Sequence, residues 1–337
     1  MLRDIKALTV VKALAVTAVV MVLLTLPSLV NPYRLFLVSL VAVYMVAGLG
    51  LTIIMGWTGQ VVLAQAAFFG MGAYLTAYWH EWMPWPLAAA LACLAAAAAG
   101  AVIGFPAVRL HGFYLAIATL AFSELVRRGF VELDSITGGI AGTDVEPVQF
   151  GGLDVAASQW YLALSVAAFA LLVAWRIRVT SLGRCLLAVR DAEVATASVS
   201  ISAARYKLVA FALSAAMGAL AGAVYGQLQA YLTPEIFGVG LLIQFLVVAF
   251  VGGVTFLLGP LLGAIFVVVA RELLQDLGAG QRLAYAIALI LVVRFLPSGL
   301  AGLPALWRRF RTRRSAAAPS APAAGEQPAL ASSGGDA

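Results

Sequence analysis

The sequence predicts an all-α integral membrane protein with about ten transmembrane helices. Of its 337 residues, 63% are hydrophobic and only 11% are charged, whereas soluble domains carry about 25% charged residues. The apolar runs are long enough to cross a bilayer core, which is roughly 30 Å thick and needs about 20 residues per helix. These runs lack the alternation of a membrane barrel, and an open sheet would leave backbone groups unpaired in lipid, so we expect the spans to be helices.

Ten apolar stretches follow one another along the chain. The first comes after Arg3, Lys6 and Lys12. It is too long for a signal peptide and no small-residue cleavage site follows it, so we expect an uncleaved helix. Short turns with Pro or Gly precede the second, third and fourth stretches. The expected spans are residues 8–30, 35–55, 61–78, 85–108, 113–126, 159–175, 208–231, 237–256, 258–274 and 283–300.

Three regions follow from this pattern. Residues 1–34 form an N-terminal cytoplasmic segment with the first span, and residues 35–307 form the transmembrane domain. Residues 308–337 begin with a cluster of arginines and continue as a tail rich in Pro, Ala, Ser and Gly. A tail of that composition cannot bury a core.

Charged residues outside the spans predict the orientation. The loop of residues 176–207 holds six Arg or Lys against two acidic residues, and the arginine cluster follows the last span. No basic residue lies between Gly129 and Ser158, where the loop is acidic. The positive-inside rule therefore places both basic segments and both termini in the cytoplasm. Arg127 and Arg128 disagree with this scheme, so we expect them to pair with Glu124 or nearby acids, or the fifth helix to stop short of them.

Within the basic loop, residues 183–201 are predicted to form a short helix. Leu182, Leu186 and Val189 make an apolar stripe, and Arg190 and Glu193 are spaced to pair across one turn. Such a helix at the cytoplasmic face is suited to contact with a soluble partner. The simpler alternative is a solvated loop that only obeys the charge rule.

The sequence offers little catalytic or coupling chemistry. His80 and His111 lie at opposite span ends, and no lysine stands in a phosphate-binding loop. Basic residues lie at span ends rather than in one patch, which is no signature of nucleic-acid binding. Ion-coupled transporters place ionisable residues within their spans. Here these residues are few: Glu124, Arg294 and the Arg271–Glu272 pair near a span end.

Glycines mark a break between the second and third spans. Gly56, Thr58, Gly59 and Gln60 lie there, and Gln65 follows closely. A break at a membrane face leaves backbone groups available to line a cavity. These five residues are therefore candidates for a translocation path. Glycine pairs with GxxxG spacing elsewhere, such as 218 with 222 and 259 with 263, are interpreted as close helix packing.

Five segments, in order along the chain, resemble the permease of branched-chain amino acid ABC importers, and within that group the M-type subunit. The similarity covers roughly residues 35–300. The segments are GLGLTIIMGWTGQVVLAQAAFFGMGAY (48–74), LHGFYLAIATLAFSELVR (110–127), SITGGIAGTDV (135–145), SLGRCLLAVRDAEVATASVSI (181–201) and VGGVTFLLGPLLGA (251–264).

The resemblance implies a multi-pass permease of the bacterial inner membrane that is not itself an enzyme and holds no cofactor. Its expected partners are membrane lipid, an H-type permease subunit, two cytoplasmic subunits that bind and hydrolyse ATP with magnesium, and a periplasmic substrate-binding protein. The short helix in the basic loop then becomes a coupling helix that docks on an ATPase subunit. The residues that match the family's docking segment are Gly183, Arg184, Ala188, Arg190, Asp191 and Glu193.

Some positions depart from the family pattern. Val62, Leu63, Ala64 and Gln65 replace a usual Ser-Leu-Gly-His, and Ser200 and Thr255 stand where Gly is common. These changes bear on how the break lines the path and on whether the substrate is leucine-like, because similar importers take up urea and short amides. Two other classes stay open: a self-sufficient secondary transporter or channel, and a membrane-embedded enzyme.

Overall fold

The computed structural model describes residues 21–110, 112–193, 196, 202–275 and 299–302. Most of the first and tenth expected spans, the C-terminal arginine cluster and the tail lie outside these residues. The described chain contains α2 (Pro32–Leu51), α3 (Gln65–His80), α4 (Trp85–Ala107), α5 (Phe113–Glu132), α6 (Asp134–Thr137), α7 (Val155–Val179), α8 (Ser181–Asp191), α10 (Ala203–Gln229), α11 (Val239–Gly252), α12 (Gly259–Leu274), the π-helical turn η1 (Thr52–Gly56), the 3-10 turns η2 (Pro234–Phe237) and η4 (Leu300–Gly302), and strands β1 (Thr143–Asp144) and β2 (Tyr231–Leu232).

The all-α membrane class is confirmed. Four stretches of the described chain are long and apolar enough to cross a membrane: Pro32–Gly56, Trp85–Ala107, Val155–Val179 and Ala203–Gln229. Each of the other expected spans that fall in the described residues also contains a helix, but α3, α11 and α12 are shorter than a full crossing. The fold class is therefore established by the structure, while the count of ten spans is not.

The fifth helix is longer than predicted. α5 runs on to Glu132 instead of stopping near residue 126, and Arg127 pairs with Glu124 at 2.9 Å one turn away. Pairing neutralises the arginine locally, which lets the helix continue through it. Of the alternatives open for Arg127, the ion pair with Glu124 is the one observed.

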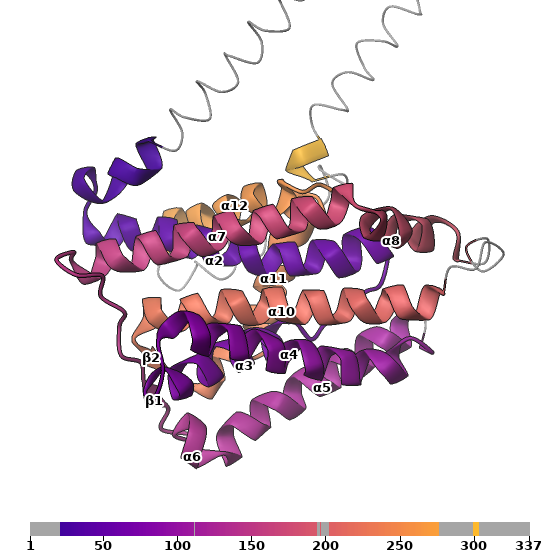
Figure 1. The fold of residues 1–337 in the computed structure, drawn as a ribbon, viewed down its shortest axis with the longest axis horizontal. Coiled ribbons are helices and arrows are strands. Elements are labelled where there is room, and N and C mark those ends of the chain that lie inside the picture. The colour runs from indigo at the N-terminus through magenta and orange to yellow at the C-terminus, as the bar shows by residue number, and fades with distance from the viewer. Residues whose placement is uncertain (1–20, 111, 194–195, 197–201, 276–298, 303–337) are drawn as a thin grey trace, which may run out of the picture.

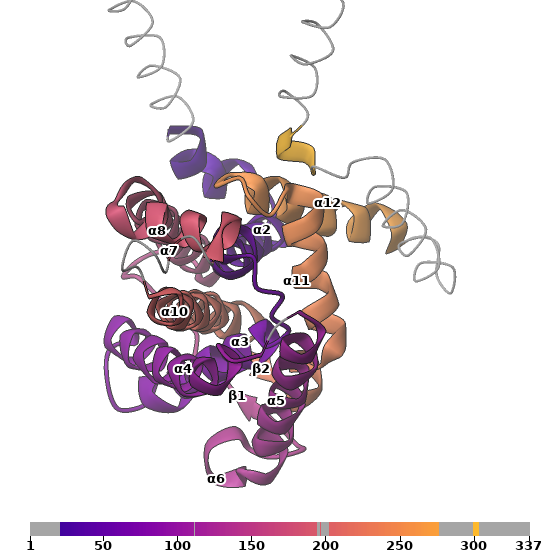
Figure 2. The same cartoon turned by 90° about the vertical axis from the view of Figure 1, so that its right-hand side faces the viewer.

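Helix α10 lies at the centre of the molecule. It runs beside α2 and α7, and Figure 2 shows it between those two helices and the pair α3 and α4. Its close approach to α3 depends on glycine. A Cβ at Gly222 would overlap the carbonyl of Phe69, and one at Gly72 would overlap the carbonyl of Ala219. The packing interpretation of Gly222 is thus confirmed.

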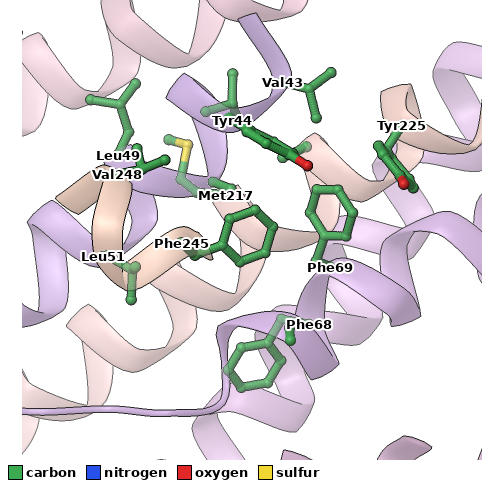
Figure 3. Close-up of a cluster of buried hydrophobic side chains, with 14 of the residues drawn as sticks. Val43, Tyr44, Leu49, Leu51, Phe68, Phe69, Met217, Tyr225, Phe245 and Val248 are labelled. Atoms are coloured by element: carbon green, nitrogen blue, oxygen red, sulfur yellow. The ribbon is translucent and has the colours of Figure 1, made fainter. Parts of the chain in front are cut away.

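The helices enclose an aromatic cluster where α2, α3, α10 and α11 meet (Figure 3). The ring of Phe245 lies 5.7 Å from that of Tyr44 and 5.0 Å from that of Phe69. Phe69 also stacks against Tyr225 at 5.0 Å. Rings at these separations have the tilted and edge-on geometries that aromatic pairs prefer. The cluster fills the bundle toward one end.

The two ends of the bundle differ in character. Figure 1 shows α8 at one end and the β1–β2 pair at the other. At the strand end, Thr143 pairs with Leu232 and Asp144 with Tyr231. The acidic loop is therefore held against the end of α10. The basic loop and the acidic loop lie at opposite ends of the bundle, as the charge rule requires of a spanning protein.

Candidate functional site

The predicted apolar stripe of the short helix is confirmed in α8. Leu186 and Val189 are buried and Leu182 is half-buried against the core. Gly183 lets α8 fold back tightly on α7, since a Cβ there would overlap the backbone of Ile177 and Arg178. Burying one face leaves the opposite face of this helix free of the bundle.

Most of the expected docking residues lie outside the buried stripe. Arg184, Arg190 and Asp191 are exposed, Ala188 is half-buried, and Glu193 is exposed just beyond the helix. A short amphipathic helix with its charged side open to solvent can receive a soluble partner.

Arg190 joins α8 to the break between the second and third spans. Its Nη1 donates a hydrogen bond of 2.5 Å to the carbonyl oxygen of Gly56. Its Cγ lies 3.2 Å from the point that a Cβ on Gly59 would occupy. The structure thus brings one residue of the docking set against two residues of the candidate path. The sequence predicted both sets but not their contact.

The predicted pair of Arg190 with Glu193 is wrong. Glu193 instead pairs with Lys207 of α10, at 2.5 Å between Oε1 and Nζ. The physical reason is that α8 ends at Asp191, well short of the predicted residue 201. Helical spacing does not apply beyond that end, so Glu193 can turn toward α10 while Arg190 reaches across to α2.

The break itself is present as predicted. The helix of α2 widens into η1, and residues 59–64 are not helical. Gly59 has a φ of 72°, a left-handed conformation that favours glycine. Thr58 Oγ1 donates to the Ile54 carbonyl at 2.5 Å. The backbone amide of Gln60 donates to the same carbonyl at 3.2 Å. These bonds satisfy the backbone that η1 leaves open.

Gln65 is fully buried and holds three helices together. Its Nε2 donates to the Ala47 carbonyl of α2 at 3.0 Å, and its Oε1 accepts from Ser214 Oγ of α10 at 3.1 Å. A neighbouring bond runs from the Leu63 amide to Thr119 Oγ1 of α5, at 2.9 Å. The side-chain amide of Gln65 thus uses both its donor and its acceptor. A path role for these residues stays a prediction.

A second arginine acts at the same face. Arg178, near the end of α7, lies over the ring of Trp57 at 5.7 Å. It also donates to the carbonyl of Thr255, in the turn between α11 and α12, at 3.3 Å. This contact uses the backbone carbonyl of Thr255, so it does not depend on which side chain stands at position 255. Arg178 of α7 therefore contacts both the break after α2 and the turn between α11 and α12, and Arg190 of α8 contacts the break after α2.

A cavity lies toward the other end of the bundle. It measures about 1030 Å³ and is lined by parts of α2, α10, η2, α11 and α12. Its polar residues include Gln229, Glu235, Gln244, Arg271 and Glu272. No local sequence pattern marks this site, because its lining residues come from separate elements. The one available signal was the Arg271–Glu272 pair. None of the five predicted path residues lines this cavity.

In the described part of the chain, no group of three or more His, Cys, Asp or Glu residues is placed to hold a metal ion.

Comparison with known proteins agrees with these features. The family model of the branched-chain amino acid transport system permease component matches residues 33–296. The chain is 32% identical to the high-affinity branched-chain amino acid transport system permease protein LivM of Escherichia coli K12, over 87% of this chain and 75% of the relative. It is 31% identical to the LivM protein of Salmonella typhimurium LT2 over the same shares. No solved structure matches. The chain therefore belongs to the family of branched-chain amino acid transport system permease components.

Proposed function

We propose that this chain is the M-type permease subunit of an ATP-binding cassette importer. It would take up branched-chain amino acids, or related small polar solutes such as other amino acids, urea or short amides. The observation that carries the proposal is the match to the permease family over residues 33–296. Two relatives with the same printed role support it over most of the chain.

The proposal includes the companions that the sequence resemblance implies. An H-type permease would complete the membrane part, two cytoplasmic subunits would bind ATP and magnesium, and a periplasmic protein would deliver the solute. The chain would lie in the bacterial inner membrane with ten spans and both termini in the cytoplasm. Opposite placement of the basic and acidic loops supports this orientation.

The contacts of α8 suggest how ATP binding reaches the spans. If an ATPase subunit docks on the exposed face of α8, closure of the two ATPase subunits moves this helix. Arg190 then transmits the motion to Gly56 and the break after α2. Arg178, at the end of α7, transmits it to Trp57 and to the turn after α11. Interrupted helices are where a bundle can change between two packings.

Reconstitution tests the proposal. The complete set of companions, assembled with this chain in liposomes, should accumulate leucine only when ATP and the loaded binding protein are both supplied. This chain alone should accumulate nothing under a proton or sodium gradient. Gradient-driven accumulation by the isolated chain would instead identify a secondary transporter.

A further inference from the structure

We propose that the cavity at the outer end of the bundle is a binding site for a zwitterionic α-amino acid with an apolar side chain. Arg271 would face the carboxylate, Glu235 or Glu272 would face the ammonium group, and the aliphatic wall would receive the side chain. The inference rests on the proposed function and deepens it, because it locates a solute site within this chain.

The position of the cavity fits a solute arriving from outside. It is lined by the start of α2, the end of α10 and the end of α12. These helix ends lie toward the β1–β2 end of the bundle, away from α8 (Figure 1). Under the orientation given by the charge rule, that end faces the binding protein.

Charges of both signs line the cavity. Arg271 and Glu272 come from the last turn of α12, and Glu235 comes from η2. Glu272 is held in place because it accepts a 2.8 Å hydrogen bond from the hydroxyl of Tyr33. Arg271 and Glu235 are exposed, and Glu272 is half-buried. One cation and two anions around one space match a ligand that carries both charges.

The remaining lining separates a polar part from an apolar part. Gln229 and Gln244 add amide groups, whereas Leu40, Leu241, Val267 and Val268 supply aliphatic side chains. A volume of about 1030 Å³ is at the upper end of small-molecule sites, which span roughly 300 to 1,000 Å³. The space therefore holds one amino acid together with water.

The aromatic cluster closes the inner side of the cavity. Tyr44 and Tyr225 belong both to the cavity lining and to the cluster (Figure 3). Tyr44 donates to Gln244 Oε1 at 3.1 Å and packs edge-on against Phe245. A solute in the cavity would thus stop above a layer of packed rings, and the layer must rearrange before the solute goes further.

Gly240 provides a probe of occupancy. It lines the cavity in the first turn of α11, and a Cβ there would meet no atom within 4 Å. Gly129 of α5 is the matched control, because it is also helical, also has no atom within 4 Å of an added Cβ, and does not line the cavity. Each would be changed to cysteine in a background with Cys93→Ser and Cys185→Ser.

The experiment measures the rate at which a membrane-impermeant methanethiosulfonate labels each cysteine in the complete importer held in nanodiscs. Millimolar leucine should slow labelling of the Gly240→Cys variant several-fold and leave Gly129→Cys unchanged. Isoamylamine, which lacks the carboxylate, and 4-methylvalerate, which lacks the amine, should not protect. Adding Arg271→Gln should weaken protection by leucine about tenfold, the loss expected for one charge-assisted hydrogen bond, and Arg271→Lys should retain part of it.

The outcomes separate this inference from the proposed function. Equal protection by leucine and by either single-charge analogue would overturn the zwitterion site, as would no protection at all in an importer that takes up leucine. Protection without ATP-dependent uptake would support the site and contradict the importer.

Discussion

At the scale of single residues, a few polar side chains make the hydrogen bonds that join separate helices of the apolar bundle. Arg190 caps the break after α2, and Gln65 satisfies polar groups on two neighbouring helices. In an apolar bundle each such contact counts, because an unpaired buried polar group costs about 1–3 kcal/mol. Substitutions at these positions should therefore have effects that are large and specific.

Changing Arg190 to Gln should uncouple ATP hydrolysis from transport. The variant loses the charged donor to Gly56, so motion of α8 no longer reaches the break. We expect leucine uptake to fall about tenfold, equivalent to about 1.4 kcal/mol, while ATP hydrolysis by the reconstituted complex persists. Arg205→Gln, an exposed arginine at the start of α10, is the matched control and should transport normally. Unchanged uptake in Arg190→Gln would refute the coupling role.

The Glu193–Lys207 pair should matter mainly for stability. The Lys207 side chain is only 5% exposed while that of Glu193 is 43% exposed, so solvent screens part of the interaction. Glu193→Gln leaves the lysine charge without its partner, and we expect a loss of about 1–3 kcal/mol. Adding Lys207→Met should recover part of it, because the buried charge is gone. Thermal unfolding of the purified protein in detergent measures both, and a further loss in the double variant would contradict this account.

At the scale of elements, glycine decides which helices touch. α3 and α10 approach so closely that Gly72 and Gly222 each face a backbone carbonyl of the other helix. α11 and α12 meet in the same way: Gly253 turns with a φ of 101°, and a Cβ on Gly263 would overlap the Val248 carbonyl. In lipid the hydrophobic effect does not hold helices together, so van der Waals contact at such close packing supplies much of the affinity of one helix for another.

Gly222→Ala should therefore be far more damaging than Gly226→Ala, one turn later on the same helix. The added methyl group overlaps the Phe69 carbonyl in the first case. In the second it meets its nearest atom at an ordinary 3.6 Å. We expect a loss of about 1–3 kcal/mol for Gly222→Ala and within about 0.5 kcal/mol for Gly226→Ala. The midpoint of thermal aggregation in detergent reports both, and equal midpoints would show that α3 and α10 are not packed as described.

At the scale of the whole molecule, the basic loop and the acidic loop lie at opposite ends of the bundle. α8, Arg178 and Arg190 lie at one end, and the folded acidic loop and the charged cavity lie at the other. The acidic loop is anchored as well as folded, since the backbone amide of Val148 donates to Gln227 Oε1 of α10 at 2.8 Å. If the bundle spans the membrane as the charge rule predicts, the basic end faces the cytoplasm and the acidic end faces the outside.

Cysteine labelling in intact cells checks this orientation. In a background free of the two native cysteines, Gly151→Cys should react with an impermeant thiol reagent from outside. It lies in the acidic loop with no atom within 4 Å of an added Cβ. Ala192→Cys, exposed just after α8, should react only after the membrane is permeabilised. The reverse pattern would invert the topology and with it the assignment of the cavity to the outer face.

Local sequence was sufficient for much of this protein. The apolar runs determined the helical membrane class, because a backbone in lipid must satisfy its own hydrogen bonds. The same local reasoning found the amphipathic α8, the break around Gly59 and the Glu124–Arg127 pair. In each case the partners lie within a few turns of each other along the chain.

Only the tertiary structure decided which distant residues meet. It joined Arg190 to Gly56 across 134 positions, paired Glu193 with Lys207 instead of Arg190, and gathered a charged cavity from five elements. Helical periodicity describes neighbours on one helix and ends where that helix ends. Contacts between helices depend on where each helix stops and on how closely glycine lets two backbones approach, and those are properties of the packed bundle.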